Sequence, residues 1–131
     1  MSERYLLDTH VLLWLLGAPD RIREDVRAEL ADRRNDLVVS AASAIEISTK
    51  VRLGKLDAPT LPATVTRRIA DLGAATLPVT VEHGLLAGSL RWDHRDPFDR
   101  LLVAQATLEE LVLVTVDGAI IGLPALRTLS W

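Results

Sequence analysis

Apolar residues along the chain follow two alternating patterns, short continuous runs and longer segments with a helical repeat. Runs such as residues 4–7, 36–40 and 111–115 are typical of buried strands. Between them, segments such as 19–35 carry apolar residues at intervals of four, which predicts amphipathic helices. The expected strands are 4–7, 36–40, 74–80, 111–115 and an edge strand at 126–131, and the expected helices are 9–17, 19–35, 41–55, 61–73, 81–91 and one opened by the motif HRDPFDRLLVAQA at 94–106.

Continuous apolar strands that alternate with helices predict parallel pairing, with helices covering both faces of the sheet. The expected fold is therefore α/β, with three layers (α/β/α) around a mostly parallel sheet of four to five strands. A chain of 131 residues has an ordinary length for one domain, so we expect residues 1–131 to form a single domain. In open sheets of this kind, ligands bind beyond the carboxyl ends of the strands, where the strand order reverses.

Five carboxylates fall where this architecture places ligand sites. Asp8 directly follows the first strand, Glu46 lies in the helix after the second, and Asp117 comes two residues after the fourth. Asp96 and Asp99 open the helix that leads into the fourth strand. Carboxylates brought together repel one another unless protons or cations compensate. Such oxygen ligands suit Mg²⁺ or Mn²⁺, which activate water for the hydrolysis of a phosphodiester.

Three of these acids also have a purely structural interpretation. Asp8 can cap the helix that follows it, because an aspartate in this position accepts backbone N–H bonds. Glu46 stands four residues before Lys50, a spacing that suits an ion pair along a helix. Asp117 and Gly118 form an ordinary turn pair. The small neighbours of Glu46 on its helix face favour a partly buried carboxylate that points toward a ligand.

The motif DPFD has the strongest structural interpretation. Asp96, Pro97 and Asp99 match the N-cap, the first position and the third position of a helix. Both acids also interact favourably with the helix dipole. Capping and metal binding are compatible at Asp99, because a carboxylate one turn into the helix can still face the strand ends.

Composition narrows the class of protein. The chain has 15 Lys and Arg against 18 Asp and Glu, a balance that does not by itself indicate a nucleic-acid binder. If the acids gather in one pocket, however, the remaining surface is close to neutral or mildly basic. The absence of cysteine excludes disulfides and thiolate metal sites and fits a reducing cytoplasm. We expect no signal peptide and no membrane span, because no apolar segment approaches about 18–20 residues.

The histidines show no spacing typical of metal ligands. His94, beside Arg95 and near Arg100, is a candidate contact for a substrate phosphate. We expect His83 to be a surface residue of the helix at 81–91, and no pattern in the sequence indicates a role for His10.

Four blocks of sequence resemble the PIN domain, and in particular the VapC-like toxins of bacterial toxin–antitoxin pairs. They are LLDTHVLLWLL (6–16), SAASAIEISTKVRLGKL (40–56), HRDPFDRLLVAQA (94–106) and LVTVDGAI (113–120). The blocks follow the family's order and span nearly the whole chain. The resemblance implies a Rossmann-like PIN fold, a Mg²⁺- or Mn²⁺-dependent endoribonuclease, a homodimer and a cognate antitoxin whose C-terminal segment occupies the active-site groove.

Matched by position, the family's catalytic acids fall on Asp8, Glu46, Asp99 and Asp117. The resemblance implies that Asp8 and Asp99 hold the metal most directly, and that Glu46 and Asp117 complete the site through water or a second ion. For Asp96, a role as helix cap and a role as metal ligand are both open.

The resemblance also assigns supporting positions and a reaction. Thr9 and Thr115 match small hydroxyl positions that support the site, and His94, Arg95 and Arg100 become candidate RNA contacts. The implied chemistry is in-line attack of a metal-activated water on a phosphodiester of tRNA or rRNA, which leaves a 5′-phosphate and a 3′-hydroxyl.

Two other functions stay open at this point. One is a different phosphoryl-transfer hydrolase on the same type of sheet, although an aspartyl-phosphatase would need Asp where this chain has His10. The other is a non-catalytic PIN-like binding module, against which the four acids argue. Apolar residues on the early helices, such as Trp14, are a candidate surface for the implied dimer.

Overall fold

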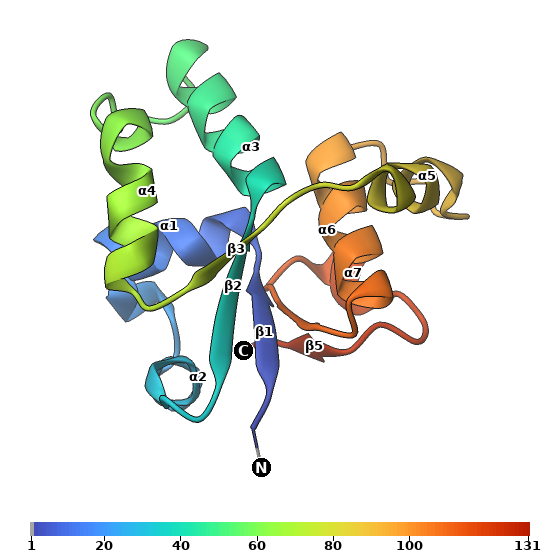
Figure 1. Ribbon diagram of the computed structural model, residues 1–131, viewed down its shortest axis with the longest axis horizontal. Coiled ribbons are helices and arrows are strands. Elements are labelled where there is room, and N and C mark those ends of the chain that lie inside the picture. Colours follow the sequence, from blue (N-terminus) through green and yellow to red (C-terminus); the bar gives the residue numbers. More distant parts are fainter. Residues whose placement is uncertain (1) are drawn as a thin grey trace.

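The computed structural model describes residues 2–131 and shows a five-stranded, all-parallel sheet (Figure 1). The strand order is β3-β2-β1-β4-β5, so the first strand lies at the centre. The predicted α/β fold with a parallel sheet is confirmed. The strands are β1 (Arg4–Leu7), β2 (Asp36–Ser40), β3 (Ala75–Leu77), β4 (Val112–Val114) and β5 (Thr128–Leu129).

Helices connect the strands and cover the sheet on both faces (Figure 1). Within residues 2–131, no helix is both long and apolar enough to cross a membrane. The helices are α1 (Thr9–Gly17), the short 3₁₀ helix η1 (Pro19–Arg21), α2 (Glu24–Ala31), α3 (Ala41–Arg52), α4 (Leu61–Asp71), α5 (Val81–Ser89), α6 (Pro97–Leu108) and α7 (Gly118–Ile121).

Side chains of each strand alternate between two hydrophobic cores, as the pleat of a strand requires. In β1, Tyr5 and Leu7 face the core formed with α1, α2 and α4, whereas Leu6 faces the core formed with α6 and α7. Leu6 and Leu7 are both fully buried. Burial on both faces explains why the strands are continuous apolar runs in the sequence.

The strand order reverses between β1 and β4, and the carboxyl ends of these two strands lie side by side. Leu7 pairs with Val114, and the Asp8 N–H donates to the Val114 carbonyl at 3.0 Å. The segments that leave β1 and β4 therefore start from one point at the edge of the sheet, which is where ligands bind in open parallel sheets.

The helix predicted at 19–35 is broken into two shorter pieces. Ile22 has extended backbone angles (φ −97°, ψ 126°), so η1 ends before it and α2 begins at Glu24. At the other end, the Asp32 carboxylate accepts the Arg34 N–H at 3.0 Å and closes a turn. Two further differences are the short helix α7, which was expected as a turn, and β5, which is shorter than the predicted 126–131 strand.

The prediction of His83 as a surface residue is wrong, because its side chain is only 1% exposed. Its Nδ1 accepts the Thr80 N–H at 2.9 Å, while the Thr80 hydroxyl accepts the His83 N–H, so the two residues form a capping box for α5. Since Nδ1 is an acceptor, Nε2 carries the proton and donates to Glu109 at 2.8 Å. His83 thus links α5 to the end of α6.

Candidate active site

A pocket of about 290 Å³ opens at the carboxyl edge of the sheet, beside the ends of β1 and β4. It collects all five of the acids singled out by their sequence positions. The pocket is lined by Asp8, His10 and Trp14 from the start of the chain, Glu46 and Lys50 from α3, Asp96 and Asp99 from the start of α6, and Val116 and Asp117 after β4.

Asp8 precedes α1 but its carboxylate does not cap the helix. Instead, the carboxylate accepts the Thr115 hydroxyl at 2.7 Å, across the gap between β1 and β4. Burial raises the pKa of the Asp8 carboxyl above its usual value, and the charge of Glu46 adds to the rise. Asp8 is therefore a buried acid held toward the pocket rather than a helix cap.

Both predicted hydroxyl residues are buried, and both make hydrogen bonds between the segments that carry the acids. The Thr115 hydroxyl donates to Asp8 and accepts the Asp117 N–H at 3.1 Å, so one side chain fixes two acids. Thr9 and Ser43 share a hydrogen bond between their hydroxyls at 2.8 Å, which ties α1 to α3. These bonds hold the helix that carries Glu46 against the end of β1.

Glu46 makes the predicted ion pair, but this pair uses only one of its oxygens. Oε2 lies 2.7 Å from the Lys50 ammonium, while Oε1 is buried without a hydrogen-bond partner among residues 2–131. Burial lowers the pKa of Lys50, but its bond to Glu46 and the charges of Asp96 and Asp99 outweigh that effect and leave the pKa raised. An unpartnered buried carboxylate oxygen is costly and needs a physical explanation.

The two aspartates of DPFD have different partners. Asp96 is the N-cap of α6, where its carboxylate accepts the N–H groups of Phe98 and Asp99 at 2.8 and 3.2 Å. The Asp99 carboxylate instead bonds to His94, with 2.6 Å between Oδ2 and Nε2. Burial, followed by the charges of Asp96 and Asp8, raises the pKa of Asp99 to about 6. Asp99 is thus the acid of the pair whose charged form is disfavoured by its surroundings in the pocket.

Asp117 joins the site while it caps the short helix α7. Its Oδ1 accepts the Ala119 N–H at 2.9 Å. Ligand atoms of His94, Asp99 and Asp117 all lie within 4.8 Å of one another, a spacing that could hold a metal ion. The turn interpretation of Asp117 is therefore correct for its backbone and incomplete for its side chain.

The basic residues near α6 divide into one exposed and one structural arginine. Arg95 is exposed and free to contact a ligand. Arg100 instead donates to main-chain carbonyls of Ala87, Leu90, Trp92 and His94 at 2.7 to 3.0 Å. Its guanidinium thereby satisfies the end of α5 and holds the loop before α6, in which Trp92 stacks on His94 with ring centroids 4.5 Å apart. Because these bonds occupy the guanidinium, Arg100 has a structural role and few of its N–H groups remain for an RNA phosphate.

The chain matches the family model of the PIN domain over residues 5–124. The chain belongs to the PIN domain family. Among curated protein sequences none matches it.

Solved structures with this PIN fold include toxin–antitoxin complexes. VapBC2 from Rickettsia felis, bound to a DNA fragment from its promoter, has a TM-score of 0.74 and 17% identity, with 98% of each chain covered. DNA-bound VapBC from Salmonella typhimurium has a TM-score of 0.70 and 19% identity, also with 98% of each chain covered. A toxin–antitoxin complex from Klebsiella pneumoniae has a TM-score of 0.67 and 18% identity, covering 95% of this chain and 96% of that one.

The donor set of this PIN domain fits a divalent cation. Five carboxylates face one pocket with Lys50 as the basic side chain of its lining, and burial raises the pKa of two of them. The unpartnered Oε1 of Glu46 supplies a free ligand oxygen. A hard cation would satisfy this oxygen and relieve the repulsion among the acids.

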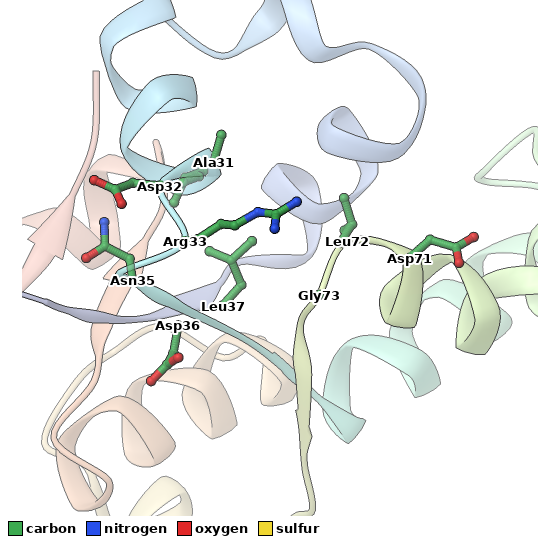
Figure 2. A pocket seen from close by; sticks show the side chains of 10 residues that line it. Ala31, Asp32, Arg33, Asn35, Asp36, Leu37, Asp71, Leu72 and Gly73 are labelled. Carbon is green, nitrogen blue, oxygen red and sulfur yellow. The ribbon is translucent and has the colours of Figure 1, made fainter.

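A larger hollow at the opposite edge of the sheet lacks such convergence (Figure 2). It has a volume of about 360 Å³ and lies at the amino ends of β2 and β3. Figure 2 shows the carboxylates of Asp32, Asp36 and Asp71 pointing in different directions. Asp32 is paired with Arg34 at 2.7 Å, so this hollow offers no shared ligand set.

Four residues that line the acidic pocket were not predicted as part of it, and two of them, His10 and Trp14, are aromatic; the other two are Lys50 and Val116. The spacing of four residues between His10 and Trp14, directly after Asp8, places them on one helix face and was the signal available in the sequence. Trp14 is half-buried against the core, which argues against the exposed dimer surface suggested for it. Among residues 2–131, the large apolar side chains that are more than half exposed are Ile45 on α3, Leu53 at the C-cap of α3, and Val81 and Leu85 on α5.

Proposed function

We propose that this PIN domain is a Mg²⁺- or Mn²⁺-dependent endoribonuclease that acts as the toxin of a toxin–antitoxin pair. The observation that carries the proposal is the convergence of Asp8, Glu46, Asp99 and Asp117 on one pocket, with a buried oxygen of Glu46 left without a partner. We further propose that residues 1–131 form one domain and that it acts in the cytoplasm.

The chain's own residues would share the work of metal and substrate binding. Asp8 and Asp99 would hold the ion most directly, with Glu46 and Asp117 completing the site. A bound divalent ion supplies an activated water and neutralises charge at the phosphoryl group. Thr115 keeps Asp8 and Asp117 in place, and Lys50 offsets part of the charge of Glu46.

The charge of the pocket also bears on the substrate. A cluster of carboxylates repels an RNA backbone, so binding of the phosphodiester depends on a cation within the cluster. His94 bonds to Asp99 in the cluster, and Arg95 is exposed next to it in the chain, so both are candidate contacts for the flanking phosphates of a tRNA or rRNA substrate. Asp96 serves as the helix cap, and its carboxylate is engaged by two backbone N–H groups.

The partners follow from the structural neighbours. Because relatives of this fold were crystallised as toxin–antitoxin complexes, we propose a cognate antitoxin that covers the acidic pocket. We also propose a homodimer as the functional unit, which the family resemblance implies. The exposed apolar side chains on α3 and α5 are available for such contacts.

The test is cleavage of structured RNA in Mg²⁺ by the wild type and by Asp8→Asn, with Asp36→Asn as the matched control. Asp36 is an exposed acid at the amino end of β2, so its variant should retain full activity. We expect Asp8→Asn to lose cleavage while its circular dichroism spectrum is preserved. Equal cleavage by Asp8→Asn would contradict the assignment of the site.

Two other outcomes would point to the alternative functions. Hydrolysis of phosphomonoesters without RNA cleavage would indicate a different phosphoryl-transfer hydrolase. RNA binding without cleavage of any RNA would indicate a non-catalytic PIN-like module.

A further inference from the structure

One wall of the acidic pocket is aromatic, and α1 supplies it. His10 and Trp14 both line the pocket, with ring centroids 6.3 Å apart and planes inclined by 46°. His10 is exposed and Trp14 is half-buried.

The indole of Trp14 is fixed in orientation by its neighbours. Trp131 packs edge-on against it, with centroids 5.9 Å apart and an angle of 64°. Trp131 is itself anchored, because its indole N–H donates to the Arg21 carbonyl at 3.0 Å. The Trp14 part of the aromatic wall is therefore ordered before any ligand arrives, which reduces the entropy lost on binding.

Packing against the hydrophobic core explains the position of Trp14 but not that of His10. Trp14 contributes to the core beneath α1, but His10 is exposed and makes no hydrogen bond or ion pair with the other described residues. The unburied ring surfaces of both residues border the pocket that holds the acids. An aromatic surface next to a carboxylate cluster suits a ligand that is flat and uncharged at one end and bears phosphate at the other.

We infer that His10 and Trp14 form a stacking subsite for one unpaired nucleobase of the substrate strand, adjacent to the phosphate bound at the carboxylates. This inference rests on the proposed function. A base is neutral, so its stacking on these rings adds affinity that the charge of the pocket does not oppose. Proteins commonly bind single-stranded RNA by stacking unpaired bases on aromatic side chains. A paired base is already stacked within its helix, so this subsite selects loops or single strands.

The test compares two probes that differ only in their bases. One is a short single-stranded RNA of mixed sequence with a fluorescent label, and the other is the same backbone with abasic riboses. Binding to the full chain is measured by fluorescence anisotropy in Ca²⁺, a hard cation that also takes oxygen ligands, so that the Mg²⁺-dependent cleavage proposed above does not consume the probe. A gel confirms that the probe is intact. We expect the wild type to bind the RNA at least about tenfold more tightly than the abasic strand.

Three variants locate the subsite. His10→Ala should weaken RNA binding about tenfold and leave binding of the abasic strand unchanged, whereas His10→Phe should restore the preference. Trp14→Leu should have the same effect as His10→Ala, but His10 decides the test because Trp14 also packs against the core. Leu108→Ala, which shortens an exposed side chain at the end of α6, should change neither affinity.

The outcomes separate this inference from the proposed function. Equal affinity of the wild type for both probes, or an unchanged preference in His10→Ala, would overturn the subsite even if RNA is cleaved. If the wild type binds both probes equally, His10 and Trp14 would instead suit contact with a side chain of a protein partner. A preference for bases that depends on His10 would support the subsite, whether or not any RNA is cleaved.

Discussion

The two ends of the sheet both carry buried polar residues, but only one end satisfies them. At the amino end, Asn35 accepts the Glu3 N–H and donates to both the carbonyl and the carboxylate of Glu29, each at 2.9 Å. The Tyr5 hydroxyl donates to the same carboxylate at 2.9 Å. At the carboxyl end, Glu46 leaves one oxygen without a partner.

This difference separates a polar cluster that stabilises the fold from one prepared for a ligand. Satisfied buried hydrogen bonds contribute to stability, whereas unsatisfied groups and clustered charges cost free energy. Near Asn35 the chain supplies every partner itself. Around Asp8 and Asp99 it raises the pKa values of its own acids by burial, which a bound cation would reverse.

The largest expected effect is the loss of RNA cleavage in Asp99→Asn. Removal of the buried carboxylate should reduce the cleavage rate by at least about a hundredfold and leave the fold intact. Asp96→Asn keeps a competent helix cap and should retain most of the activity. Cleavage rates of the two purified variants on one RNA substrate measure this difference, and equal loss in both would show that Asp96 also serves the site.

At the amino end, Asn35→Ala should give the opposite combination of effects. It removes three hydrogen bonds and leaves partners unsatisfied, so the free energy of unfolding should fall by about 2–3 kcal/mol. Urea denaturation measures the loss, and the cleavage rate well below the melting temperature should match the wild type. Reduced cleavage by a fully folded Asn35→Ala protein would link the two ends of the sheet.

A somewhat smaller effect is expected for Arg100→Lys. An ammonium cannot reach the four carbonyls that the guanidinium fork satisfies, so we expect a loss of about 1–2 kcal/mol in unfolding free energy. Hydrogen exchange should accelerate in the loop at 90–95. Weaker RNA binding at unchanged stability would instead assign Arg100 to RNA contact.

The smallest effect concerns the metal-free protein and its dependence on pH. The pKa of Asp99 is raised to about 6 in the fold, so its contribution to stability is present below its unfolded pKa of 3.8 and is lost as the pH rises through 6. In EDTA at pH 7, Asp99→Asn should therefore be more stable than the wild type, by about 1 kcal/mol after allowance for solvent screening. At pH 4 the two proteins should unfold alike. Thermal unfolding at both pH values measures the difference, and a less stable variant at pH 7 would contradict it.

The sequence was sufficient for features that depend on local pattern and topology. Continuous apolar runs identified β1, β2 and β4, and the positions of Asp8 and Asp117 just after β1 and β4 placed both acids at one edge. Features that depend on distant partners were missed. His83 can be buried because Glu109 and Gln105, more than twenty residues away, form hydrogen bonds with its ring nitrogens. Arg100 is structural because α5 ends beside it, which its position in a basic motif does not reveal.

The most direct test of the central claim is the binding of Mn²⁺ at pH 7, measured by electron paramagnetic resonance of the free ion. Wild-type protein should remove the free Mn²⁺ signal in a saturable manner, and added Mg²⁺ should restore it. The double variant Asp8→Asn/Asp99→Asn should leave the signal unchanged. Undiminished free Mn²⁺ with excess wild-type protein, or equal binding by the double variant, would contradict a metal site at the carboxyl end of the sheet.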